Sequence, residues 1–151
     1  MMLTTKARYA VMAVIDMAYS YDNQKPITLA DISVRQKIAL SYLEQIFNKL
    51  RKAGIVRAIK GPGGGYLLTE ANFEIAKVIE AVEENIEMTR CSNRTSAGCM
   101  PDNTKCSTHD LWEGLNQQIR SYFNNVTIED VTSGRLKNKI NALNIETLSG
   151  V

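Results

Sequence analysis

The apolar residues in the first third of the chain recur at helical spacing and predict three helices. The first is expected over residues 5–21. Thr28 is a favourable N-cap residue and predicts a short second helix over residues 29–36. The third helix is expected to begin at Ser41, because Ser41 and Glu44 stand at the spacing of a capping box.

The third helix is amphipathic, and a β-hairpin is expected after it. Its apolar positions fall at i, i+3, i+4 and i+7, namely Leu43, Ile46, Phe47 and Leu50. A short helix, a tight turn and a second amphipathic helix form a helix-turn-helix, whose second helix enters the DNA major groove. Residues 55–60 and 66–69 are typical of short strands, joined by the glycine-rich turn 61–65. The sequence therefore predicts a winged helix-turn-helix, mainly α-helical with a small β-hairpin wing.

The rest of the chain is expected to hold a connecting helix, a loop and a long dimerisation helix. The expected parts are a DNA-binding domain (1–69), the connecting helix (70–90), the loop (91–109), the dimerisation helix with a short terminal helix (110–133), and a flexible tail (134–151). Apolar residues follow one side of the long helix: Leu111, Trp112, Leu115, Ile119, Tyr122 and Phe123. Such a side in a small protein predicts a partner surface. A two-fold mate would place two recognition helices about 34 Å apart.

The composition is that of one globular domain, with 151 residues, 44% of them hydrophobic and 23% charged. No apolar run approaches the length of a transmembrane helix and the N-terminus lacks signal-peptide features, so a cytoplasmic protein is expected. The charge is uneven. Residues 1–66 carry ten Lys and Arg against four Asp and Glu, whereas residues 67–151 carry eight against twelve. A basic first half indicates a module that binds a polyanion such as DNA.

All three cysteines and the single histidine fall within the loop, at Cys91, Cys99, Cys106 and His109. Thiolates and imidazole are ligands for zinc or for an iron–sulfur cluster. Only Cys106 and His109 have the close spacing usual in structural zinc sites, and a 2Fe–2S cluster accepts His in place of Cys. Three unrelated free cysteines and a surface histidine are the alternative, which the clustering disfavours. We find no nucleophile–base or paired-carboxylate pattern, so an enzyme is not expected.

Several segments together resemble the IscR-like family of iron–sulfur winged-helix transcriptional regulators of bacteria, which includes relatives that sense iron or nitric oxide. They are LTTKARYA, LADIS, LSYLEQIFNKLRKAGIV, KGPGGGYLL, VIEAVEE, the Cys/Cys/Cys/His loop and the LW pair after it. The resemblance extends to about residue 131. It implies a homodimer that binds palindromic double-stranded DNA under control of a 2Fe–2S cluster and regulates iron–sulfur cluster assembly genes. It assigns the four loop residues as the cluster ligands.

The resemblance also implies which residues contact DNA. Ser41, Tyr42, Glu44 and Gln45 match the recognition-helix positions, and in the family the glutamate helps the cluster-free protein to discriminate between two kinds of operator. Gln pairs well with adenine and Glu accepts from cytosine N4. Lys60 and Gly61 lie in the wing, where Lys60 replaces the usual Arg. Phosphate contacts are expected from Lys6, Arg8 and Arg51.

The expected mechanism is a population shift. The loop, ordered when a cluster binds, would fix the dimerisation helix against the winged domain and change which operator is tolerated. The alternatives are an iron- or nitric-oxide-responsive repressor of the same fold, a winged-helix regulator with structural zinc, and a redox component or electron carrier. A redox component or electron carrier would have no need of a basic winged helix.

Overall fold

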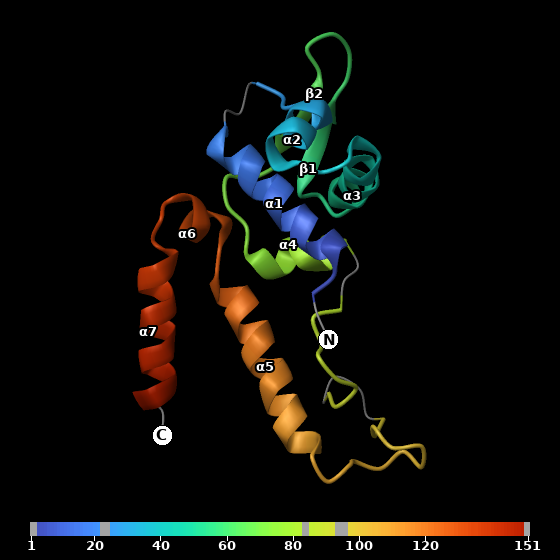
Figure 1. Cartoon of the computed structure of the whole chain (residues 1–151), viewed down its shortest axis with the longest axis vertical. Helices are drawn as coiled ribbons and strands as arrows, with labels where there is room; N and C mark the ends of the chain where they lie inside the picture. The colour runs from blue at the N-terminus through green and yellow to red at the C-terminus, as the bar shows by residue number, and fades with distance from the viewer. Residues whose placement is uncertain (1–2, 22–24, 83–84, 93–96, 150–151) are drawn as a thin grey trace.

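The computed structural model describes residues 3–21, 25–82, 85–92 and 97–149, except for the side chains of 145–149. A winged-helix domain occupies the upper part of Figure 1, and a long helix descends from it to a loop at the far end. Among the described residues no helix is long and apolar enough to cross a membrane. The expected fold class, mainly α-helical with a two-stranded wing, is confirmed.

The first three helices follow the apolar pattern closely. They are α1 (Thr5–Tyr19), α2 (Leu29–Gln36) and α3 (Leu40–Lys52). Thr4 caps α1, with its hydroxyl accepting from the Ala7 N–H at 3.4 Å, and Thr28 caps α2 by accepting from the Asp31 N–H at 3.1 Å. These hydroxyls satisfy amides that have no partner within the helix. The helix α1 ends two residues earlier than expected.

The expected capping box at the start of α3 is wrong. Ala39 is the N-cap and no side chain caps the helix, so Ser41 lies within the first turn. The turn before α3 explains the shift. Ile38 is buried in the core, and its carbonyl accepts a hydrogen bond from the Ser33 hydroxyl at 2.6 Å. The next carbonyl, that of Ala39, therefore already accepts the first helical hydrogen bonds, from Tyr42 and Leu43 at 3.1 Å each.

The wing is an antiparallel pair, β1 (Val56–Ile59) and β2 (Gly65–Leu68), with Val56 opposite Leu68 and Ile59 opposite Gly65. Ile27 adds a bridge to β2, because its N–H and carbonyl bond to Tyr66 at 2.9 and 2.8 Å. This close approach requires a glycine at position 65. Its φ is +153°, and a Cβ there would lie 2.5 Å from the Ile27 carbonyl oxygen.

One hydrophobic core lies between α1, α3, residues 73–82 and residues 126–128. Figure 1 shows α1 crossing the middle of the domain, with α4 (Ile75–Ala81) below it and α3 to its right. The alanines on α1 let neighbouring helices pack closely, and the large side chains of α3 fill the interior. The fully buried residues with the largest side chains include Met17, Leu43, Ile46, Phe47, Leu50, Ile79 and Ile128.

The connecting helix is much shorter than expected: α4 spans Ile75–Ala81, and described residues 85–90 are not helical. After the loop come α5 (His109–Asn125) and α6 (Ile128–Thr132), both close to their predicted bounds. The chain on either side of these helices is tied back to the winged domain. The Ile75 N–H donates to the Val126 carbonyl and the Ile128 N–H to the Phe73 carbonyl, both at 2.9 Å.

The tail, which we expected to be flexible, contains a helix, α7 (Leu136–Ser149). Leu136 packs against the core, and Ile140 and Leu143 are half-buried on the same side of the helix. Lys139 bonds to Asp130 at 2.6 Å, joining α7 to α6. The signal was weak because the apolar positions do not form one stripe: Ala142, Ile145 and Leu148 fall away from the side of Leu136, Ile140 and Leu143. The three asparagines of the segment are also poor helix formers.

Candidate DNA-binding face and metal centre

The recognition helix α3 turns its predicted base-contacting side chains outward. Ser41, Glu44 and Gln45 are exposed, whereas Tyr42 is half-buried and packs edge-on against Tyr9 of α1, with ring centroids 5.6 Å apart. This contact places the start of α1 beside the start of α3. Tyr42 therefore helps to position α3 against α1, and it also lies at the edge of the exposed side of α3.

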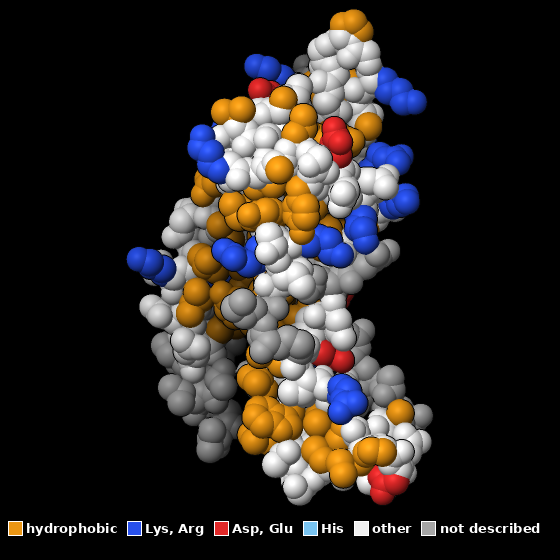
Figure 2. All heavy atoms as spheres, turned by 45° about the vertical axis from the view of Figure 1, so that its right-hand side comes forward, with side chains coloured by type: hydrophobic (Ala, Val, Ile, Leu, Met, Phe, Trp, Pro, Cys, Tyr) orange, Lys and Arg blue, Asp and Glu red, His pale blue; other side chains and the backbone are white. Residues whose placement is uncertain are grey.

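Basic side chains surround this helix. Arg8 and Arg51 are exposed, Lys6 is half-exposed, and Lys60 and Gly61 lie exposed at the wing. Figure 2 shows Lys and Arg side chains spread over the face that carries α3 and the wing, with few acidic ones between them. A face of this kind suits a phosphate backbone, because each cation that meets a phosphate releases a condensed counterion.

The four donor residues of the loop converge in space. One ligand atom each from Cys91, Cys99 and His109 lies within 4.8 Å of the others. The Cys91 and Cys106 Sγ atoms are 3.7 Å apart, and Cys99 Sγ lies 3.4 Å from His109 Nδ1. The Cys106 N–H also donates to Cys99 Sγ at 3.2 Å. No disulfide links the three thiols. Loop residues 93–96 lie outside the described residues.

The donors differ in how readily they lose a proton. Burial raises the pKa of the Cys91 thiol to about 11, and the neighbouring thiols Cys99 and Cys106 reinforce the effect. The Thr108 hydroxyl lowers the pKa of Cys106 to about 7, with a further contribution from Cys99. A metal cation would displace the remaining thiol protons, because the thiolate is the ligand. The soft sulfur donors and the imidazole fit an iron–sulfur cluster or zinc.

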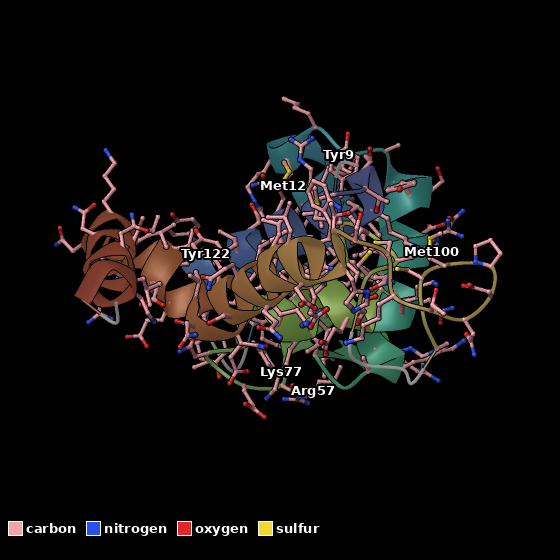
Figure 3. All side chains as sticks on the ribbon, turned by 90° about the horizontal axis from the view of Figure 1, so that it is seen from below. Tyr9, Met12, Arg57, Lys77, Met100 and Tyr122 are labelled. Carbon is pink, nitrogen blue, oxygen red and sulfur yellow. The ribbon has the colours of Figure 1, made fainter. Side chains whose placement is uncertain are left out.

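The helix α5 exposes its apolar side. Leu111, Trp112, Leu115 and Tyr122 are between 37% and 63% exposed, while the helix's fully buried residues are all polar. Ile119, Tyr122 and Phe123 line a groove of about 680 Å³ between α5 and α7. Figure 3 shows Met100 of the loop and Tyr122 at opposite ends of α5. The exposed Trp112 also donates its indole N–H to the Thr108 hydroxyl at 3.1 Å.

Sequence reasoning missed the residues that hold the loop to α5. Glu113 and Asn116 are buried on α5. Asn116 accepts a hydrogen bond from the Met88 N–H, and Glu113 accepts one from Arg120. Their spacing from His109, four and seven residues, puts all three on one side of the helix. This pattern is visible in the sequence, but polar residues at helical spacing usually mark a solvated face.

The winged fold, the exposed recognition helix and its basic surroundings define a DNA-binding transcriptional regulator of the winged-helix class. Residues 3–134 match the Rrf2 family of iron-dependent transcriptional regulators. The chain belongs to the Rrf2 family. The expectations of an IscR-like transcriptional regulator and of a protein that is not an enzyme are thereby confirmed.

Similar proteins of known sequence and structure agree with this assignment. The HTH-type transcriptional regulator IscR of Pectobacterium carotovorum is 47% identical over 137 residues, covering 89% of this chain and 81% of the relative. The IscR of Yersinia pseudotuberculosis has the same identity and coverage. Among solved structures, CymR, the global cysteine regulator of B. subtilis, superposes with a TM-score of 0.71 at 26% identity, covering 88% of this chain and 97% of CymR. T. potens IscR gives 0.70 at 26% identity, covering 89% and 88%.

Proposed function

We propose that this regulator binds a 2Fe–2S cluster through Cys91, Cys99, Cys106 and His109, and that the cluster controls its choice of operator. The supporting observation is that the donors gather as two pairs, Cys91 with Cys106 and Cys99 with His109, at 3.7 and 3.4 Å. A 2Fe–2S cluster needs two protein ligands on each of two irons. Relatives 47% identical to this chain carry the name IscR. When bound, such a cluster would supply a redox-sensitive and oxygen-sensitive group.

The DNA-binding form in this proposal is a homodimer on a palindromic operator, acting in the bacterial cytoplasm on iron–sulfur assembly genes. The apolar row of α5 supports the dimer, since Leu111 is 63% and Leu115 39% exposed in one copy. The groove between α5 and α7 would offer a second copy both apolar side chains, such as Ile119 and Leu143, and polar ones, such as Gln118 and Asn144. Two-fold pairing of helix-turn-helix proteins matches two half-sites about one DNA turn apart.

A second candidate is a structural zinc ion. Three donors lie within 4.8 Å of one another, which is close enough for them to share a single metal ion. This alternative keeps the DNA-binding role and removes the response to iron or oxygen.

Anaerobic reconstitution with iron and sulfide tests the proposal. We expect a brown protein with the absorption and Mössbauer spectra of a 2Fe–2S centre. In the same sample, we expect operator preference to differ from that of the metal-free protein. A colourless protein that retains zinc would support the second candidate. A Cys91→Ala, Cys99→Ala, Cys106→Ala variant should bind every operator as the metal-free protein does; if it matched the loaded wild type instead, control by the cluster would be refuted.

A further inference from the structure

The buried side of α5 is polar, the reverse of an ordinary amphipathic helix. Its three buried residues are His109, Glu113 and Asn116, at 3%, 4% and 0% exposure. Burying polar groups costs free energy unless they are hydrogen-bonded. The elements packed against this side must therefore supply polar partners.

Asn116 finds its partners in the backbone of the strap, which we define as residues 87–92. Its Oδ1 accepts from the Met88 N–H at 2.8 Å, and its Nδ2 donates to the Cys91 carbonyl at 2.9 Å. The Thr89 hydroxyl lies 3.4 Å from the same Nδ2 and accepts from the Cys91 N–H at 3.3 Å. One side-chain amide thus holds the backbone at two points, three residues apart, ending at Cys91.

A second set of contacts encloses this one. Arg120 bonds to Glu87 of the strap at 3.4 Å and to Glu113 at 3.0 Å. The Ser92 hydroxyl donates to Glu87 at 2.8 Å. Glu87 is therefore fixed to α5 through Arg120, and Ser92 is tied to α5 through Glu87, by partly buried hydrogen bonds to charged groups, which are stronger than those between neutral groups.

We propose that Asn116 is a positioning residue of the metal centre. It fixes Cys91 relative to His109, which α5 itself carries at the start of the same helix. Ligands that are held in place before a metal binds pay less ordering entropy when it does. A change at the centre can thus reach α5 in two ways, directly through His109 and through the strap. This inference rests on the proposed function, because it assumes that Cys91 and His109 ligate one centre.

Two substitutions at this position separate the two hydrogen bonds. Asn116→Ala removes both, so in the metal-free protein we expect faster hydrogen exchange at the Met88 amide. Asn116→Asp keeps an acceptor for Met88 but cannot donate to the Cys91 carbonyl, so we expect that amide to remain protected. In both variants we expect the reconstituted centre to be lost to a chelator about tenfold faster than in wild type, as for other residues that orient ligands. Asn124→Ala, at an exposed asparagine of the same helix, is the matched control.

The decisive measurement is the decay of visible absorbance under anaerobic chelation. If both Asn116 variants kept the centre as long as wild type while Asn116→Ala lost protection at Met88, the positioning role would be refuted. Should Asn116→Ala fail to fold, Thr89→Val removes the neighbouring hydroxyl with little change of shape; a smaller acceleration supports the role and an unchanged rate opposes it. If wild type itself takes up no iron and sulfide, the proposed function fails first, and the two failures are thereby distinguished.

Discussion

Asp16 is a carboxylate buried on α1 and held by two side chains of α2. Arg35 donates to it in a bidentate pair, with Nε at 3.0 Å from Oδ1 and Nη2 at 2.7 Å from Oδ2, and Gln36 donates to Oδ1 at 2.7 Å. Burial acts to raise the pKa of Asp16, but the hydrogen bonds from Arg35 and Gln36 outweigh it and the pKa is lowered. The ionised form therefore stabilises the packing of α1 on α2.

Arg35→Ala should lower the free energy of unfolding by about 2 kcal/mol at pH 7, because it leaves the buried carboxylate with a single side-chain donor. A carboxyl whose pKa is lowered on folding stabilises above its unfolded pKa, and this contribution is lost as the pH falls through the folded value. The difference in the free energy of unfolding between Arg35→Ala and wild type should therefore become smaller below about pH 4. Urea unfolding at pH 7 and pH 3 measures it, with Arg8→Ala, exposed on the same α1, as control. If the difference in unfolding free energy stayed constant with pH, the ionised pairing of Asp16 with Arg35 would be contradicted.

Gly65→Ala should destabilise the winged domain by about 2 kcal/mol, since the residue has φ +153° and its Cβ would press on the Ile27 carbonyl. Gly61→Ala separates the two causes. Its φ is +90°, but nothing lies within 4 Å of its Cβ, so it carries backbone strain alone and should cost about 1 kcal/mol. Thermal unfolding compares the two. Equal losses would show that the contact with Ile27 is relieved by a small shift.

At the scale of elements, the sequence predicted those whose apolar residues face a core within one copy. Hydrophobic periodicity and turn residues predicted the helices α1, α2 and α3 and the wing. Their apolar residues pack against one another within the winged domain, so the pattern reports their burial directly. The start of α3 was missed by one residue, since the burial of Ile38 decides it. The helix α7 was missed because its apolar residues are spread around the helix and form no single stripe. The donor set was predicted as a cluster of residue types, but its attachment through Asn116 depends on a backbone partner that no residue pattern announces.

The helix α5 shows what an inverted amphipathic element implies. Its buried side is polar, and in the proposed homodimer its exposed apolar residues would contact a second copy. Leu115→Lys should therefore convert the dimer into a monomer at concentrations where wild type is dimeric, weakening association by about thirtyfold, which corresponds to a hot-spot loss of 2 kcal/mol. Light scattering after gel filtration measures the mass. Asn124→Lys adds the same charge on the opposite side of the helix. If it weakened association as much as Leu115→Lys, the apolar side of α5 would not be the dimer interface.

At the scale of the whole molecule, α5 connects the donor loop to the winged domain. It spans 17 residues, about 25 Å at 1.5 Å per residue. Its first residue is His109, and the chain just after its last residue pairs with the segment 73–75. Asn72 strengthens this pairing, which we call the joint, because its Oδ1 accepts from the Glu129 N–H at 2.9 Å in the first turn of α6, the helix that Thr127 caps. A displacement at the loop can therefore reach the winged domain through this joint, through the direct packing of α5 on α4, and through the strap.

Asn72→Ala should loosen the joint without touching the donor loop. Losing this hydrogen bond costs about 1 kcal/mol of stability. We expect the reconstituted centre to survive chelation as long as in wild type, while the difference in operator affinity between loaded and metal-free protein becomes smaller. This is the opposite of the pattern expected for Asn116→Ala, which should shorten the life of the centre. Asn138→Ala, at an exposed asparagine of α7, is the control. Titration of labelled operator with loaded and metal-free protein gives the two affinities, and an unchanged ratio would mean that the signal does not depend on this joint.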